Sequence, residues 1–198
     1  MVSMKLFSEG AEALIYSTNL YGSEVMIKYR APKRYRIRIL DESIRKLRTK
    51  KEAKLMVRAA KAGVNVPEII GVAESAIYLE RIKGKLLKDT TISSQLARKS
   101  AQQLAKLHNA GITHGDFTPA NLMAKGKEIY LIDFGLADSN SSSEERALDL
   151  LLMKRQLAQK RYLEFANSYS KYAKSSKETL RRLSEIEERG RYQSRTLD

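Results

Sequence analysis

The chain has 198 residues, 42% of them hydrophobic, which is enough for one compact domain with a core and argues against wholesale disorder. It has no cysteine and only two histidines, so disulfides and thiolate metal sites are excluded and little remains for zinc. Lysine and arginine outnumber aspartate and glutamate by 37 to 23, and this net charge of +14 favours a polyanionic partner.

The first part of the chain, about residues 1–82, is predicted to be rich in strands. Apolar-rich runs at 13–16 and 25–29 are separated by Tyr21-Gly22-Ser23, a typical hairpin turn sequence. Two further strands are expected across residues 66–82, in VPEIIGVAES and AIYLERI.

One long helix is predicted within this strand-rich part, over residues 41–63. Asp41 stands where it can cap the start of the helix, and Gly63 stands where helices commonly end. Glu52 falls in the middle of the apolar face of this helix. Because a carboxylate on such a face is costly to bury alone, we expect Glu52 to have a partner.

From residue 83 onward the periodicity is helical. A helix is expected from about Ile92 to near Gly111, a small hairpin over 122–134, a polar loop at 139–145 and one long helix over 147–173, with 176–188 also helical. The pattern predicts a single α+β domain in two lobes: a β-rich N-lobe with one long helix (about 1–82), a reduced helical C-lobe (about 83–188) and a basic tail (189–198).

Basic residues are concentrated in two places. Twelve lysines and arginines lie between Lys28 and Lys54, and a second group lies in RGRYQSR at 189–195. These basic residues could simply form the solvated surface of a charge-rich protein, but we favour nucleic acid as their binding partner. An anionic membrane is disfavoured because no basic helix has a bulky apolar face. The sequence also has no apolar run of 18 residues and no signal peptide, so we expect a cytoplasmic protein.

Five residues stand in the order that phosphoryl transfer from ATP requires. Lys28 ends a strand, Glu52 lies in the next helix, Asp116 and Asn121 share the loop HGDFTPAN, and Asp133 follows a strand in IDFG. Asp116 would orient or deprotonate the acceptor, while Asn121 and Asp133 would supply oxygen ligands to Mg²⁺. Lys28, held by Glu52, would grip the α- and β-phosphates.

Each residue alone has a simpler explanation. Asp-Phe-Gly is often a turn, a single lysine is usually solvated, and Glu52 could pair with Arg48 four residues earlier. The five together, in order, are difficult to explain without a function. His114 is expected to support the loop, and His108 is expected at a helix end rather than as a ligand.

The residues resemble the protein-kinase-like fold and, within it, the small atypical kinase subunit of the KEOPS (EKC) complex, the PRPK-like family. The resemblance covers nearly the whole chain. It depends on SEGAEA at 8–13, KYRAPKRYR at 28–36, the HGDFTPAN and IDFG pair, and the basic tail. Gly115 stands where regulated kinases usually carry arginine, and no Ala-Pro-Glu follows Asp133. Loop-phosphate control and peptide docking are therefore reduced.

The resemblance implies an ATPase, also described as an atypical serine/threonine kinase, that uses ATP and Mg²⁺. It would support threonylcarbamoyladenosine formation at adenosine 37 of tRNA. The implied partners are the threonylcarbamoyl-transferase subunit on the C-lobe and tail, a small regulatory subunit on the N-lobe, and tRNA. The residues that we assign to ATP, besides Lys28 and Glu52, are Glu9, Gly10, Ala11, Glu12, Ala13, Glu80 and Ile82.

The basic residues are assigned to tRNA or partner contacts. They are Lys33, Arg34, Arg36, Arg189, Arg191, Tyr192 and Arg195. The aromatic ring of Tyr192 could stack on a base, or it could belong to a solvent-exposed terminus.

Two other functions stay open at this stage. A stand-alone phosphotransferase for a small hydroxyl compound would need an acidic pocket for a cationic substrate, which the charge of +14 disfavours. A scaffold without turnover has no chemical need for Lys28, Glu52, Asp116, Asn121 and Asp133 together.

Overall fold

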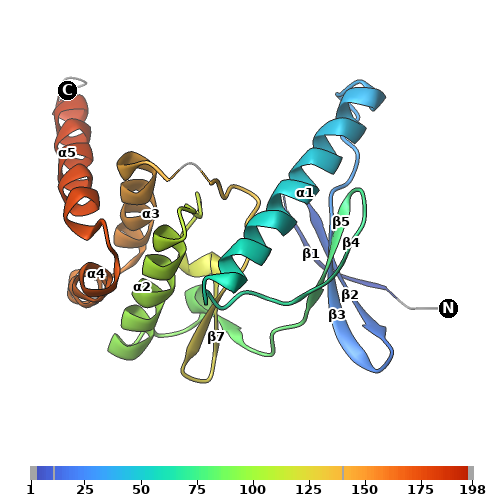
Figure 1. Ribbon diagram of the computed structural model, residues 1–198, viewed down its shortest axis with the longest axis horizontal. Helices are drawn as coiled ribbons and strands as arrows, with labels where there is room; N and C mark the ends of the chain where they lie inside the picture. Colours follow the sequence, from blue (N-terminus) through green and yellow to red (C-terminus); the bar gives the residue numbers. More distant parts are fainter. Residues whose placement is uncertain (1–3, 11, 140, 196–198) are drawn as a thin grey trace.

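The computed structural model describes residues 4–10, 12–139 and 141–195, with side chains described as far as Arg189. The chain forms two lobes, a twisted sheet with one long helix and a helical part that carries a small second sheet (Figure 1). The predicted two-lobed α+β arrangement is confirmed. No helix among the described residues is long and apolar enough to cross a membrane.

The N-lobe sheet is antiparallel throughout, with strand order β1-β2-β3-β5-β4. The predicted hairpin joins β2 to β3 through Tyr21 and Gly22, whose φ angles of 50° and 84° indicate a type I′ turn. The sequence did not distinguish β1 as a separate strand. The bounds are β1 (Lys5–Glu9), β2 (Leu14–Leu20), β3 (Ser23–Tyr29), β4 (Ile69–Val72) and β5 (Ala76–Glu80).

Helix α1 (Arg38–Lys61) begins three residues before the predicted start, so the prediction that Asp41 caps it is wrong. Ile37 occupies the cap position without a side-chain hydrogen bond. Asp41 is instead buried within the first turns, where its carboxylate accepts from Arg45 Nε at 2.6 Å and from the backbone N–H of Lys33 at 3.2 Å. It therefore ties the segment before the helix to the helix itself.

The C-lobe combines four helices with a three-stranded sheet of order β6-β7-β8. The predicted hairpin is confirmed as β7 and β8, and within the predicted polar loop Ser142 and Glu145 form a capping box at the start of the next helix. The bounds are β6 (Lys85–Leu86), η1 (Leu87–Asp89), α2 (Ser94–Asn109), η2 (Pro119–Asn121), β7 (Leu122–Lys125), β8 (Glu128–Leu131), α3 (Ser143–Gln156), α4 (Gln159–Tyr172) and α5 (Ser176–Arg195).

The single long helix predicted over 147–173 is two helices in the structure. The backbone is extended at Leu157 and Ala158, and α3 ends there. Neither residue breaks a helix by its own propensity. The chain changes direction at this break, and Met153 on α3 and Phe165 on α4 belong to the same buried cluster. Helix α5 also continues through Arg195, so the predicted tail is helical to that residue.

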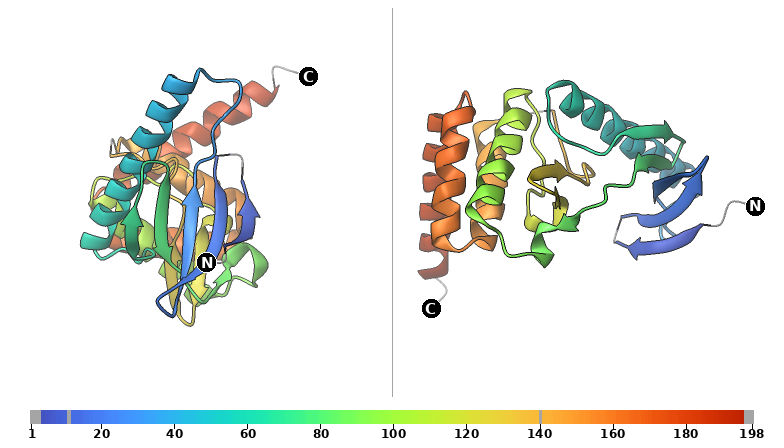
Figure 2. Two further views of the ribbon diagram at one scale, coloured as in Figure 1. Left: turned by 90° about the vertical axis from the view of Figure 1, so that its right-hand side faces the viewer. Right: turned by 90° about the horizontal axis from the view of Figure 1, so that it is seen from below.

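The main hydrophobic core extends across both lobes. Leu55, Met56 and Ala59 in the second half of α1 belong to the same buried cluster as the C-lobe helices. A smaller cluster under the N-lobe sheet contains Val25 and Ile27. The second half of α1 thus lies between the sheet and the helical lobe, while its first turns project beyond the sheet (Figures 1 and 2).

Two positions on α4 test this core. Phe165 is fully buried, whereas Leu163 on the same helix is 55% exposed. We expect Phe165→Ala to lower the free energy of unfolding by about 3–5 kcal/mol because it leaves a cavity, and Leu163→Ala to change it by less than about 1 kcal/mol. Urea unfolding of both variants measures the difference. Equal losses would contradict the assigned packing of α4.

Candidate active site

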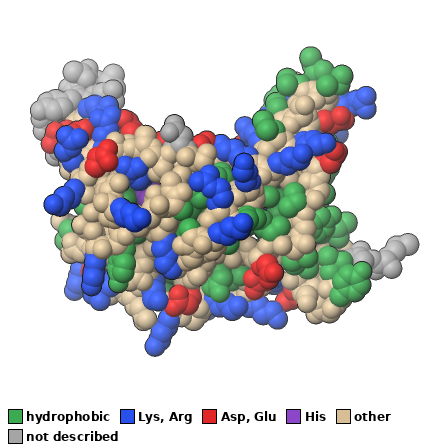
Figure 3. Space-filling view, viewed as in Figure 1, with side chains coloured by type: hydrophobic (Ala, Val, Ile, Leu, Met, Phe, Trp, Pro, Cys, Tyr) green, Lys and Arg blue, Asp and Glu red, His purple; other side chains and the backbone are tan. Residues whose placement is uncertain are grey.

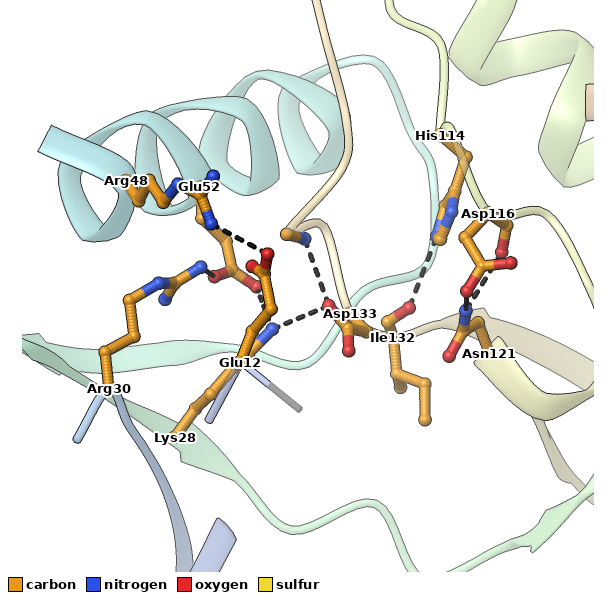
Figure 4. Close-up of polar contacts among 11 residues, drawn as sticks. Glu12, Lys28, Arg30, Arg48, Glu52, His114, Asp116, Asn121, Ile132 and Asp133 are labelled. Carbon is orange, nitrogen blue, oxygen red and sulfur yellow. Dashed lines mark hydrogen bonds and ion pairs between the residues drawn. The ribbon is translucent and has the colours of Figure 1, made fainter. Parts of the chain in front are cut away.

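A buried ion cluster joins the N-lobe sheet to α1. Lys28 on β3 donates to Glu52 Oε1 at 2.7 Å, and Arg30 Nη2 donates to Glu52 Oε2 at 2.7 Å (Figure 4). The Glu52 side chain is 2% exposed, and both of its oxygens are paired. Glu52 thus has the partner that was expected for it, and in fact has two, Lys28 and Arg30. The alternative pairing with Arg48 does not occur, because Arg48 binds Glu12 at 2.7 Å.

Asp133 lies within reach of the same lysine from the other lobe. Its Oδ1 is 2.6 Å from Lys28 Nζ and accepts from Gly135 N at 3.0 Å. Burial acts to raise the pKa of Asp133, but the Lys28 ammonium outweighs it and holds that pKa below the usual range. The carboxylate therefore stays ionised. Asp133 also has a φ of 62°, a conformation that residues other than glycine seldom adopt.

Asp116 and Asn121 are held together within one loop. Asn121 Nδ2 donates to Asp116 Oδ2 at 2.7 Å and to Asp116 O at 2.9 Å. The backbone N–H of Ile132 donates to Asn121 O at 3.0 Å, which ties this loop to the segment before Asp133. His114, on the same loop, lies with Nε2 3.2 Å from Ile132 O, in the supporting position expected for it (Figure 4).

Asp149 is a residue that sequence reasoning missed. It is fully buried on α3, and its carboxylate accepts from the backbone N–H groups of His114 at 2.8 Å and Gly115 at 2.9 Å. His108 Nε2 lies 3.1 Å from the same carboxylate, and His108 Nδ1 lies 2.7 Å from the Tyr169 hydroxyl. Asp149 positions the start of the Asp116 loop. A single acid inside the apolar run ALDLLLM was the available signal.

Burial sets the protonation of His108. It lowers the pKa of the imidazole, although the nearby Asp149 carboxylate opposes this. A neutral ring has one N–H and one acceptor nitrogen. Nε2–H then donates to Asp149, which can only accept, and Nδ1 accepts from the Tyr169 hydroxyl. This network fixes Asp149 beneath the loop.

Gly115 is required by the backbone. Its φ is 77°, and a Cβ built there would lie 2.4 Å from the carbonyl oxygen of Leu136. No larger residue fits without a shift of the chain after Asp133. The absence of an arginine at this position therefore has a steric basis as well as the regulatory one inferred from sequence.

A cavity of about 440 Å³ lies between the lobes beside these residues. Of the residues assigned to ATP and metal, it is lined by Lys28, Glu52, Glu80, Ile82, Asn121 and Asp133. Glu9, Gly10, Glu12 and Ala13 do not line it, whereas Phe7 and Ser8, which share strand β1 with Glu9, do. Ala11 lies outside the described residues. Apolar side chains suited to a flat aromatic base cover much of the wall, among them Ile15, Met26, Leu79, Met123 and Ile132.

The donor set fits a magnesium ion that is shared with phosphates. Among the described residues, no cluster of three or more His, Cys, Asp or Glu could hold a metal without help. Asp133 Oδ2 and Asn121 Oδ1 accept no hydrogen bond from any of the described residues, so both oxygens are available to a metal ion. Mg²⁺ is usually held by one or two such oxygens together with phosphates and water.

The basic residues assigned to tRNA or partners lie on both lobes. Lys33 and Arg36 line a second, smaller cavity beside α1, and Arg34 is exposed nearby. Arg189 is on α5 at the far end of the C-lobe, 3.4 Å from Glu144 (Figure 1). The side chains of Arg191, Tyr192 and Arg195 lie outside the described residues.

Gly115 and Gly126 offer a matched test, because both have positive φ but nothing lies within 4 Å of a Cβ at Gly126. Gly126→Ala should cost about 1–2 kcal/mol for the left-handed backbone alone. Gly115→Ala should cost at least about 1 kcal/mol more, because it also meets Leu136 O. Urea unfolding gives both values. Equal losses of unfolding free energy in the two variants would show that the backbone after Asp133 shifts without cost to accommodate the added Cβ.

Comparison with known proteins agrees with the family resemblance that the sequence motifs indicated. The RIO domain family matches residues 15–154, and so omits the beginning and the tail that the resemblance singled out. "KEOPS complex subunit Bud32" of Pyrococcus abyssi is 36% identical over 98% of both chains. "Probable serine/threonine-protein kinase BUD32 homolog" of Archaeoglobus fulgidus is 42% identical, over 86% of this chain and 90% of that protein.

Some relatives are much longer. A "Probable bifunctional tRNA threonylcarbamoyladenosine biosynthesis protein" of Methanobrevibacter smithii is 37% identical over 94% of this chain, which spans only 36% of that protein.

Solved structures confirm the kinase-like fold. The Rio2 kinase-ADP/Mg²⁺-phosphoaspartate complex of Chaetomium thermophilum superposes with a TM-score of 0.68 at 15% identity, covering 96% of this chain and 71% of that one. WaaP in complex with acyl carrier protein gives 0.68 at 16% identity, covering 99% and 89%. At such identities the likeness concerns the fold alone. The family match and the two relatives covered almost end to end show that the chain belongs to the RIO-domain family of atypical kinases and, within it, to the Bud32 proteins.

Proposed function

We propose that this chain is a Mg-ATP-dependent ATPase and atypical serine/threonine kinase that acts as a subunit of the KEOPS complex. In that role it would support threonylcarbamoyladenosine formation at adenosine 37 of tRNA. One observation carries the proposal. The Lys28 ammonium contacts both the Glu52 carboxylate, at 2.7 Å, and the Asp133 carboxylate, at 2.6 Å, beside the loop that holds Asp116 and Asn121. The names of the Pyrococcus and Methanobrevibacter relatives support the complex and the tRNA modification.

The roles of the residues follow from their positions. Lys28, oriented by Glu52, would contact the α- and β-phosphates, and Asn121 and Asp133 would hold Mg²⁺, which neutralises phosphate charge when it is bound. Asp116, fixed by Asn121, would orient the acceptor hydroxyl or water and take its proton. The apolar wall and the segment at Glu80 and Ile82 would contact the adenine ring.

The basic surface supports the tRNA part of the proposal. Lysine and arginine side chains are spread over the face that extends from the helical lobe to α1 (Figure 3). Contacts from such residues to phosphates carry no sequence information. Choice of tRNA would then come from the partners, namely the threonylcarbamoyl-transferase subunit at the C-lobe and tail and a small regulatory subunit on the N-lobe. A cytoplasmic location follows from this role.

Asp116→Ala tests the chemistry. It should lower steady-state ATP hydrolysis by about 100-fold or more, because the acceptor loses its base, while ATP affinity changes little. Hydrolysis is measured with and without the transferase subunit and tRNA. Glu188→Gln, an exposed acid on α5, removes one negative charge far from the site, so the chain assayed alone should keep full activity.

The alternative outcomes separate the competing functions. Unchanged turnover in Asp116→Ala would overturn the assigned mechanism. A wild-type chain that hydrolyses no ATP under any of these conditions would favour a scaffold. Turnover that depends on a small hydroxyl compound would favour a stand-alone phosphotransferase.

Binding of tRNA should depend steeply on salt. If lysines and arginines neutralise phosphates, the logarithm of the binding constant falls linearly with the logarithm of the salt concentration, with a slope that counts the contacts. Filter binding or fluorescence anisotropy at several potassium chloride concentrations measures this slope. A flat response would remove the electrostatic part of the proposal.

A further inference from the structure

A second cavity lies beside α1, apart from the one between the lobes. Its volume is about 200 Å³, smaller than the roughly 300–1,000 Å³ of sites for drug-sized ligands. The charged residues that line it are Glu12, Arg30, Lys33, Arg36, Arg45 and Arg48. Its size and its lining suit a single small anion.

The cations around this cavity outnumber the carboxylates that they contact. Glu12 pairs with Arg48 at 2.7 Å, and Glu52 pairs with Arg30 at 2.7 Å. Asp41 contacts both Arg45, at 2.6 Å, and Arg36, at 3.5 Å. Four arginines thus meet three carboxylates, a local excess of 4 − 3 = +1, and Glu52 is also shared with Lys28. An anion bound in the cavity would offset this excess.

Arg30 points to the same conclusion independently of the charge count. The residue is only 2% exposed, and its Nη2 is bonded to Glu52. Its Nε and Nη1 are buried and find no hydrogen-bond acceptor among the described residues. Buried unpaired donors are costly and uncommon in native proteins. The planar guanidinium is well matched to phosphate oxygens.

We infer that this cavity is a binding site for a phosphate-class anion, held by the arginines around Arg30. The inference goes beyond the proposed function, since it holds whether or not the chain turns over ATP. The site is connected to the nucleotide side at two points. Arg48 binds Glu12 in the segment between β1 and β2, and Arg30 shares Glu52 with Lys28 (Figure 4). An anion that engages Arg48 would compete with Glu12, whose exposed ion pair is weak.

Inorganic phosphate is the probe, titrated at constant ionic strength against chloride. NMR resonances of the arginine Nε–Hε groups report binding, with and without ADP present to occupy the cavity between the lobes. We expect a saturable shift in the wild type. In Arg36→Gln/Arg48→Gln the affinity should fall by about tenfold or more, because two charged donors are lost.

Lys46→Gln/Lys50→Gln is the matched control. It removes the same amount of charge from residues of α1 that do not line the cavity, and it should bind phosphate like the wild type. A linear shift without saturation, or one affinity shared by the wild type and both double variants, would overturn the inference as general charge screening.

Glu12→Gln tests the site in the opposite direction, without loss of any arginine. It removes the carboxylate that competes for Arg48, so phosphate should bind more tightly than to the wild type; unchanged or weaker binding would overturn the inference. A short single-stranded oligoribonucleotide then distinguishes the source of the phosphate. Displacement of inorganic phosphate by the oligonucleotide assigns the site to RNA phosphates, and no displacement assigns it to free phosphate. Failure here is distinct from failure of the proposed function, which is measured by the hydrolysis of ATP.

Discussion

The Glu52 carboxylate is the contact on which the arrangement of the two lobes depends. It is buried on α1, and a buried carboxylate is tolerated only when its oxygens are paired. Its two partners, Lys28 and Arg30, lie at the end of β3, so the helix is held against the sheet at one defined register. Lys28 then reaches Asp133 across the gap between the lobes. One acid thereby positions the group that would neutralise phosphate charge.

A second buried acid has the corresponding role in the C-lobe. Asp149 makes no contact with the cavity between the lobes, yet its two oxygens accept backbone N–H groups at the start of the Asp116 loop. The two acids support different parts of the site. Glu52 holds the Lys28 side chain, and Asp149 holds the backbone at the start of the Asp116 loop. Removal of either would leave charged or polar groups unpaired in the core. This explains how so small a C-lobe can keep an ordered loop.

Local signals in the sequence were reliable where a few neighbouring residues decide the outcome. The Tyr21-Gly22 turn, the Ser142 capping box and the end of α1 near Gly63 all depend on contacts within one or two turns of chain. The order of the candidate residues along the chain also predicted phosphoryl transfer from ATP, and the resemblance carried by SEGAEA, KYRAPKRYR, the HGDFTPAN and IDFG pair and the basic tail gave the kinase-like fold and the family. The break at Leu157 was missed because it arises from packing of α3 and α4 into a common core, and no local residue signals it.

The sequence by itself determined the types of chemical group, their order and the elements that carry them. Tertiary structure alone decided which groups meet. Lys28 and Asp133 are 105 residues apart, and Arg48 turns to Glu12 rather than to Glu52 one helical turn away. The steric reason for Gly115 is likewise the carbonyl of Leu136, which no pattern around Gly115 indicates. Periodicity and capping depend on near neighbours along the chain, whereas burial and ion pairing depend on which distant segments share a core.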